Sequence, residues 1–321
     1  MAAEREHAES SGTENATVAK AAGLRSAGPE AQLRAAIGFQ QGVSNRAVAR
    51  AAAAQLLARE PAPLAEHSSA VNTAVTGQAF VQGAGDIGDI DANDVRQGLL
   101  GDCNLLAPAA AIARANPEAI RRLITPNTDG SYNVTLYYKD HFWSDLTAHT
   151  LRVTSQFYMG ADGSPIYARY GDTGASGPEL WVMLIEKAFA RYRGSYTAAG
   201  GALWDREGLE LLTGNPASEL GVGDGTPAEL LTMISDALRE GKAITVNTST
   251  SRWQNWTRTA AEQAEITRYN IKLDHAYSIE AVDTAAQTLN LRNPWGFSHI
   301  TNLPVSMFRR YFNTWSRVSV R

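Results

Sequence analysis

Apolar side chains recur at helical spacing in the middle of the chain. Residues 178–193 (PELWVMLIEKAFARYR) form an amphipathic pattern behind Pro178, and proline favours the first turn of a helix. The sequence predicts further helices at residues 103–124 and 227–240, and Gly241 closes the latter. These three segments supply the helical part of the predicted fold.

Strands are predicted by alternation of apolar and polar positions. Residues 131–139 and 149–159 alternate in this way, with turn signals at Asp129-Gly130 and Asp162-Gly163. Runs suited to strands then follow at 242–248, 275–282, 287–292 and 315–320. A helical first half before a β-rich second half predicts an α+β fold with a groove between the halves.

The composition changes near residue 82. Residues 1–82 are rich in Ala, Glu, Ser and Gln, and Phe39 and Phe80 are their only aromatic residues, so they bury little core. We expect a leader here, flexible at its start and helical later, that serves as a propeptide or a delivery segment. A helical lobe at 83–200 and a β-rich lobe at 201–321 are expected to follow it.

The overall charge excludes several classes of partner. The chain has 321 residues, of which 44% are apolar and 19% charged, as in ordinary soluble globular proteins. Its formal net charge of −4 gives no basic field for nucleic acid or anionic lipid. It contains no apolar run of membrane-spanning length, and its first residues lack the apolar stretch of a secretory signal. The single cysteine, Cys103, excludes an internal disulfide and a cysteine-based metal site.

The one cysteine stands where a predicted helix begins. It ends the segment QGLLGDC, which starts at Gln97 and contains two glycines. A thiol at a helix N-terminus faces free N–H groups and the positive end of the helix dipole, which favours the thiolate. The Cys103 N–H and the Gln97 amide offer two donors to a developing oxyanion. A buried structural thiol is the alternative interpretation.

Two later segments supply partners for the thiol. LDHAYSI places His275 and RNPWG places Asn293 eighteen positions apart, which suits two adjacent strands joined by a turn near Asp283. Trp295 then shields the bond between imidazole and amide from water. One Cys followed far downstream by His and Asn is typical of papain-type enzymes, in which the imidazole exchanges the thiol proton and the amide fixes its tautomer.

These segments, in this order, resemble the signature motifs of the calpain cysteine peptidases. The stretch ELW…LIEKAFA…GSY, which begins at Glu179, is similar to the long helix of the calpain protease core, and REGLELLTG (206–214) to the segment after it. MFRRYF, which begins at Met307, matches the closing helix of that core. The resemblance covers roughly residues 85–321. It implies a papain-like fold, with a helical lobe, a β-rich lobe and a cleft between them.

The resemblance also implies an activity and the residues that carry it. The family hydrolyses protein or peptide substrates as a cysteine-type endopeptidase. At the matching positions, Cys103 is the nucleophile, His275 the general base, Asn293 the orienting amide, Gln97 the oxyanion donor and Trp295 the wall beside the histidine. No calmodulin-like or C2-like segment matches, so a minimal bacterial form is implied.

Calcium is a further implication of the resemblance, although the chemistry itself needs no cofactor. The acidic ligands of the family's first core site fall on Asp94 and Glu179, and Ca²⁺ prefers oxygen ligands. The alternative is that Asp94 caps a loop and Glu179 favours the start of a helix. Two positions depart from the family: Asn104 replaces a large aromatic residue, and Pro108 lies early in the predicted helix.

The leader carries a resemblance of its own. Residues 42–50 (GVSNRAVAR), followed by LLAR at 56–59, resemble a short helix of bacterial proteins linked to contractile injection systems and polymorphic toxins. This implies an effector or toxin-associated peptidase that is cytoplasmic in its producer and exported without a signal peptide, with residues 1–82 contacting the injection apparatus. Two alternatives stay open: an inactive calpain-like binding module, and an acyltransferase on the same scaffold.

Overall fold

The computed structural model describes residues 71–320, apart from 84–85, 87, 142, 205 and 249–257. The predicted leader helices lie outside the described residues, and the boundaries expected at residues 82 and 200 stay predictions. No helix in the described part of the chain is long and apolar enough to cross a membrane.

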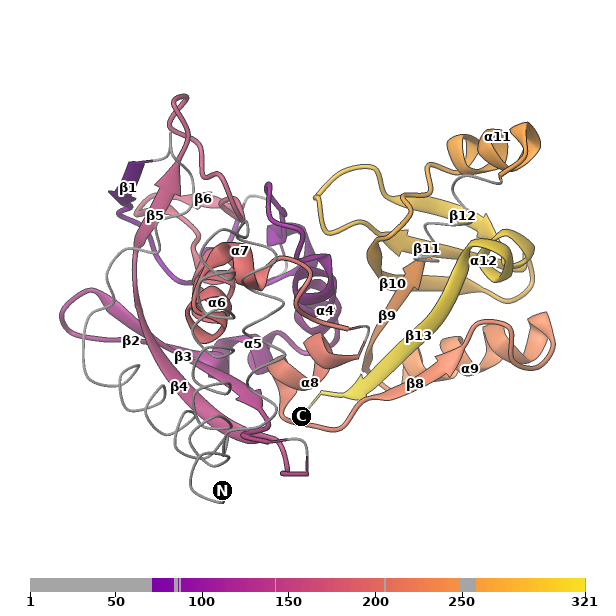
Figure 1. Ribbon diagram of the computed structural model, residues 1–321, viewed down its shortest axis with the longest axis horizontal. Helices are drawn as coiled ribbons and strands as arrows, with labels where there is room; N and C mark the ends of the chain where they lie inside the picture. Colours follow the sequence, from indigo (N-terminus) through magenta and orange to yellow (C-terminus); the bar gives the residue numbers. More distant parts are fainter. Residues whose placement is uncertain are drawn as a thin grey trace, which may run out of the picture. The chain divides into compact units, whose positions relative to one another are not determined.

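The first half of the described chain is mainly helical (Figure 1). Its helices are α4 (Cys103–Ala115), α5 (Pro117–Leu123), α6 (Trp181–Arg193), α7 (Tyr196–Ala199) and α8 (Glu207–Thr213), with the short 3-10 helix η1 (Ala92–Asp94). An antiparallel sheet of order β2-β3-β4 lies among them, formed by Ile124–Pro126, Ser131–Tyr138 and Thr147–Thr154. Two strand pairs complete this half: β1 (Val71–Ala74) with β5 (Gln156–Met159), and β6 (Thr173–Gly174) with β7 (Gly177–Pro178).

The second half is built on one antiparallel sheet with strand order β12-β11-β10-β9-β13-β8. The strands are β8 (Ser218–Gly221), β9 (Lys242–Thr248), β10 (Ala276–Asp283), β11 (Thr288–Arg292), β12 (Ile300–Pro304) and β13 (Phe312–Ser319). The helices of this half are α9 (Pro227–Arg239), α11 (Ala260–Arg268) and α12 (Val305–Tyr311). The α+β fold predicted from the sequence is confirmed.

Each half has its own hydrophobic core. Trp181 and Phe189 of α6 belong to the first core, and Trp315 and Phe308 belong to the second. The alanine-rich helix α4 is buried along its length from Leu105 to Ala113, and it packs against both β9 and β10. Small side chains allow this close approach on all sides of a helix. Helix α4 therefore brings its first residue to the place where the two halves meet.

Three predicted elements are corrected by the structure. The helix predicted over 103–124 is two helices, because Asn116 is extended before Pro117, and proline disfavours helical geometry in the residue before it. Pro178 does not start a helix: it pairs with Thr173 in β7, and α6 begins at Trp181. The strand predicted at 149–159 is divided into β4 and β5.

Candidate active site

Cys103 lies in a cavity of about 560 Å³ to which both halves contribute. From the first half, Gln97, Leu99 and Asn104 line it; from the second, Asn247, Asp274, His275 and Trp295. Gly201, Leu203 and Trp204 form another part of the wall. The structure therefore gathers Cys103, His275, Gln97 and Trp295 around one cavity.

The thiol of Cys103 is protonated in this conformation. Burial raises its pKa to about 11, and the backbone amides of Ala276 and Asn104 oppose this shift only in part. Among the described contacts, none is a hydrogen bond between Cys103 and His275. The amide of Asn104 at the helix N-terminus lowers the thiol pKa, as predicted, but desolvation of the charge outweighs it.

The imidazole is held by a hairpin. Strands β10 and β11 pair antiparallel through Ser278 and Arg292, as the spacing of the two motifs predicted, and His275 immediately precedes β10. The His275 Nε2 lies 2.9 Å from Asn293 Oδ1, and both residues are buried. The ring centroids of His275 and Trp295 are 4.9 Å apart, so the indole covers the pair.

The surroundings of Asn293 fix the tautomer of His275. Asn293 Oδ1 also accepts a hydrogen bond from the backbone N–H of Trp295 at 3.0 Å, so this atom is an acceptor. The bond at 2.9 Å therefore requires an N–H on His275 Nε2 and leaves a lone pair on Nδ1. Burial lowers the pKa of His275, while the bond to Asn293 opposes that shift. A neutral imidazole with a free Nδ1 is a suitable proton acceptor for a thiol.

Gln97 is anchored with one of its two amide hydrogens. Its Nε2 donates to the Leu100 carbonyl at 2.7 Å, and its backbone N–H donates to the Pro294 carbonyl at 2.8 Å. A side-chain amide has two N–H donors, and the Gln97 side chain also interacts with Asp102. Because Gln97 lines the cavity beside Cys103, its amide can serve an oxyanion there.

A buried carboxyl pair lies behind the nucleophile. The Asp102 side chain caps no amide of α4 and interacts with Glu186 of α6. Both oxygens of Glu186 accept from the Ala168 N–H at 2.9–3.0 Å. Burial raises the pKa of Asp102 to about 7 and that of Glu186 well above its usual value. The sequence signal for Glu186, a charge on the apolar face of a predicted helix, was overlooked.

Asn104 and Pro108, the two departures from the family pattern, both face α8. Asn104 Nδ2 donates to the Leu203 carbonyl at 3.0 Å. Pro108 has no N–H for the Asn104 carbonyl, and that oxygen instead approaches Gly208, where an added Cβ would lie only 1.9 Å from it. Helix α4 continues through Pro108 to Ala115. Both residues thus join the nucleophile helix to the cavity wall that precedes α8.

Asp94 and Glu179, the predicted calcium ligands, are buried side by side. Asp94 Oδ2 accepts from Trp181 Nε1 at 3.0 Å, and Glu179 Oε1 accepts from the Val81 N–H at 2.9 Å. Burial, together with the neighbouring Asp94, raises the pKa of Glu179 to about 9, and burial raises that of Asp94 to about 6.

Whether Asp94 and Glu179 suit a metal ion depends on the ligand atoms that lie around them. A Cβ added to Gly171 would lie 2.1 Å from Glu179 Oε2, so the backbone approaches the carboxyls closely. Among the described residues, no group of three His, Cys, Asp or Glu side chains is placed to hold a metal ion. The two carboxyls offer the oxygen ligands that Ca²⁺ prefers.

The fold and the cavity together define a cysteine peptidase core of the papain-like class. The sequence profile of the calpain family of cysteine proteases matches residues 80–319, and this chain belongs to that family. The human calpain-2 catalytic subunit and human calpain-8 are each 30% identical to it over 217 residues, and the mouse calpain-2 catalytic subunit is 29% identical. These matches cover 65% of this chain but only 29% of each relative.

Proposed function

We propose that this chain is a calpain-like cysteine endopeptidase that cleaves peptide bonds with Cys103, His275 and Asn293. The observation that carries the proposal is the 2.9 Å contact between His275 Nε2 and Asn293 Oδ1, which frees Nδ1 in the cavity that Cys103 lines. No cofactor is needed for this chemistry.

The reaction follows from the proton positions. His275 Nδ1 takes the thiol proton as the sulfur attacks the substrate carbonyl, and the carbonyl π electrons move to oxygen. The Cys103 N–H and the Gln97 side-chain amide stabilise that oxyanion. Collapse of the intermediate breaks the C–N bond, and protonated His275 gives its proton to the leaving amine. His275 then deprotonates a water that attacks the thioester, and the thiol is regenerated.

The test is cleavage of an unfolded protein by the full chain, with Cys103→Ala and His275→Ala variants beside it. The proposal requires internal cuts with new free carboxyl and amino termini in the wild type and none in either variant. Products joined to an added amine would identify an acyltransferase instead. Absence of any product from the wild type, with and without calcium, would favour the inactive binding module.

Calcium binding between Asp94 and Glu179 is the second part of the proposal. What supports it is a pair of adjacent buried carboxyls, Asp94 and Glu179, whose pKa values are raised mainly by burial. When bound, the ion supplies positive charge that allows both groups to ionise; it takes no part in the proton transfers. We expect calcium, but not magnesium, to raise the melting temperature of protein that was first treated with a chelator. The Asp94→Asn/Glu179→Gln variant should not respond, whereas the surface control Asp236→Asn should.

Delivery by residues 1–82 is the third part, and what supports it is the sequence resemblance alone. The chain would be made in the cytoplasm of a bacterium and loaded into an injection apparatus as an effector or toxin. Deletion of residues 1–70, which keeps strand β1, should abolish co-purification with such particles while Cys103→Ala retains it. Different N-termini in the wild type and Cys103→Ala would show instead that the leader is removed as a propeptide.

A further inference from the structure

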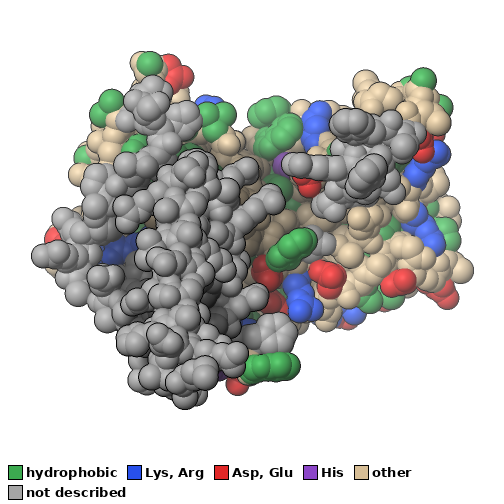
Figure 2. Space-filling view, viewed as in Figure 1, with side chains coloured by type: hydrophobic (Ala, Val, Ile, Leu, Met, Phe, Trp, Pro, Cys, Tyr) green, Lys and Arg blue, Asp and Glu red, His purple; other side chains and the backbone are tan. Residues whose placement is uncertain are grey.

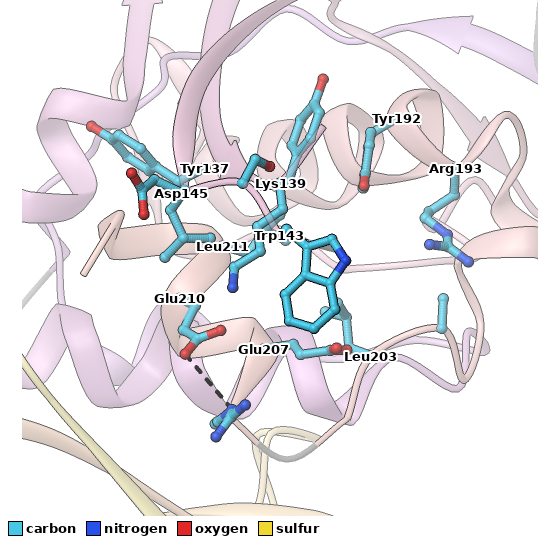
Figure 3. A pocket seen from close by; sticks show the side chains of 15 residues that line it. Tyr137, Lys139, Trp143, Asp145, Tyr192, Arg193, Leu203, Glu207, Glu210 and Leu211 are labelled. Atoms are coloured by element: carbon cyan, nitrogen blue, oxygen red, sulfur yellow. Dashed lines mark ion pairs between the residues drawn. The ribbon is translucent and has the colours of Figure 1, made fainter. Parts of the chain in front are cut away.

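A second cavity has a volume of about 610 Å³, and Figure 3 shows the side chains that line it. Its apolar lining comes from the end of β3, the loop after it, the end of α6, and α8 with the segment before it. We call it the tyrosine pocket; its apolar residues are Tyr137, Tyr138, Trp143, Tyr192, Leu203 and Leu211. None of these side chains takes part in the proposed peptide hydrolysis.

The walls of the tyrosine pocket are held before any ligand arrives. The Tyr138 ring is stacked between His149 and Tyr192, with centroid distances of 3.7 and 3.9 Å. The Tyr137 ring packs on Gly214, where an added Cβ would lie 2.6 Å from it. Stacked rings in fixed positions have little rotamer freedom left to lose when a ligand binds.

The charges around the pocket balance. Lys139, Arg193 and Arg206 contribute three positive charges, and Asp145, Glu207 and Glu210 contribute three negative ones. Three of these groups are already engaged: Arg206 pairs with Glu210 at 3.7 Å, and Glu207 accepts a hydrogen bond from the Trp204 backbone N–H at 2.9 Å. Aromatic walls with no excess of either charge favour a large uncharged side chain as the ligand.

The tyrosine pocket shares a wall residue with the cavity around Cys103. Leu203 lines both, and its carbonyl is held by Asn104, the residue after the nucleophile. Exposed apolar side chains border both cavities. Leu99 and Trp204 line the catalytic cavity, and Trp143, which is 88% exposed, lines the tyrosine pocket. Exposed apolar side chains gathered in one region mark a binding surface.

The wall that the two cavities share favours one occupant of the tyrosine pocket, the polypeptide bound in the catalytic cleft. We propose that the tyrosine pocket receives a large apolar side chain of the substrate polypeptide, at a position outside the residues that flank the scissile bond. The site would make the enzyme selective for extended or unfolded segments that carry such a residue at a set distance from the cut. This inference rests on the proposed peptidase function and deepens it.

The experiment compares long and short peptides with the full chain. Peptides of about twelve residues extend roughly 40 Å, and peptides of about four residues stay within the cleft. A single phenylalanine is moved through each position of the long peptide against an alanine background. The Trp143→Ala variant is tested against Val71→Ala, a matched control that is 67% exposed on β1 and lines neither cavity.

The wild type and Val71→Ala should favour phenylalanine at one distant position. Trp143→Ala should lower kcat/KM for that peptide about five- to thirtyfold and leave the short peptides unchanged, because one aromatic contact is lost. An equal loss on short and long peptides, or no loss at all, overturns the proposal.

A binding measurement separates this proposal from the peptidase function. The Cys103→Ala variant should bind the phenylalanine peptide more tightly than the all-alanine peptide by fluorescence anisotropy, and adding Trp143→Ala should remove the difference. This result supports the pocket even if the wild type cleaves nothing. Equal affinities of the Cys103→Ala variant for the two peptides would overturn the proposed pocket.

Discussion

At the scale of single residues, the chemistry depends on the position of one proton. Asn293 Oδ1 accepts from both His275 and the Trp295 amide, so the imidazole carries its hydrogen on Nε2. The thiol keeps its own proton because burial holds its pKa near 11. A neutral pair therefore precedes attack, and the proton moves during the reaction.

The raised thiol pKa predicts how Cys103 reacts with iodoacetamide in chelator. Only the thiolate reacts, so the alkylation rate should increase steadily from neutral pH toward pH 11. The rate is followed by intact mass, and Cys103→Ala is the blank because the chain has no other cysteine. A plateau already reached at neutral pH would show a preformed thiolate and contradict this.

Asn293 is predicted to act through the histidine. Asn293→Ala should lower kcat on the order of 10²-fold, because the imidazole loses its fixed tautomer. Asn293→Asp keeps an acceptor oxygen and should recover part of the rate. Its carboxylate raises the pKa of His275, so the acidic limb of the pH–rate profile should move to higher pH. A merely structural Asn293 would leave that limb in place.

At the scale of elements, the packing of α4 against α8 sets the cavity wall. Gly208 leaves room for the Asn104 carbonyl that Pro108 cannot bond. Gly208→Ala should therefore lower the free energy of unfolding by about 1–3 kcal/mol, as overpacking does. Gly223→Ala, with no atom within 4 Å of the added Cβ, is the control for urea denaturation. Equal midpoints for the two variants would show that the contact relaxes without cost.

The sequence predicts the bounds of a helix well where neighbouring residues determine its ends. The predicted helix 227–240 nearly matches α9, because Pro227, the Thr226 capping box and Gly241 mark the helix ends locally. The break at Asn116 has a local signal in Pro117 that the prediction did not use, whereas the strand position of Pro178 depends on its pairing with Thr173. The catalytic candidates came from motifs whose residue types carry the chemistry. Glu186 had a signal as a charge on an apolar helix face, but its partner Asp102 and the lining of the tyrosine pocket are set by tertiary packing.

At the scale of the whole molecule, the charge is spread rather than concentrated. Figure 2 shows acidic and basic side chains interspersed over the β-rich half. The unusual charges are inside: Asp94, Glu179, Asp102 and Glu186 are all at most 3% exposed.

These buried carboxyls predict how stability depends on pH. Their pKa values are raised in the folded state, so the folded chain holds protons that the unfolded chain releases. In chelator, these carboxyls should lower the stability as the pH rises above about 4, because the unfolded chain then releases protons that the folded chain retains.

Urea midpoints across this pH range provide the measurement. Glu186→Gln should flatten the profile, and calcium should offset the part due to Asp94 and Glu179, because the ion takes the place of the proton. A stability that increases steadily from pH 5 to pH 9 in chelator would contradict the assignment of raised pKa values.

The most direct test of the proposed active site is covalent labelling by a peptidyl chloromethyl ketone, which needs both the cleft and the proton transfer. One label per chain on Cys103, formed by the wild type at neutral pH and lost in His275→Ala, is the predicted result. Equal labelling rates in the wild type and His275→Ala would contradict a catalytic pair of Cys103 and His275.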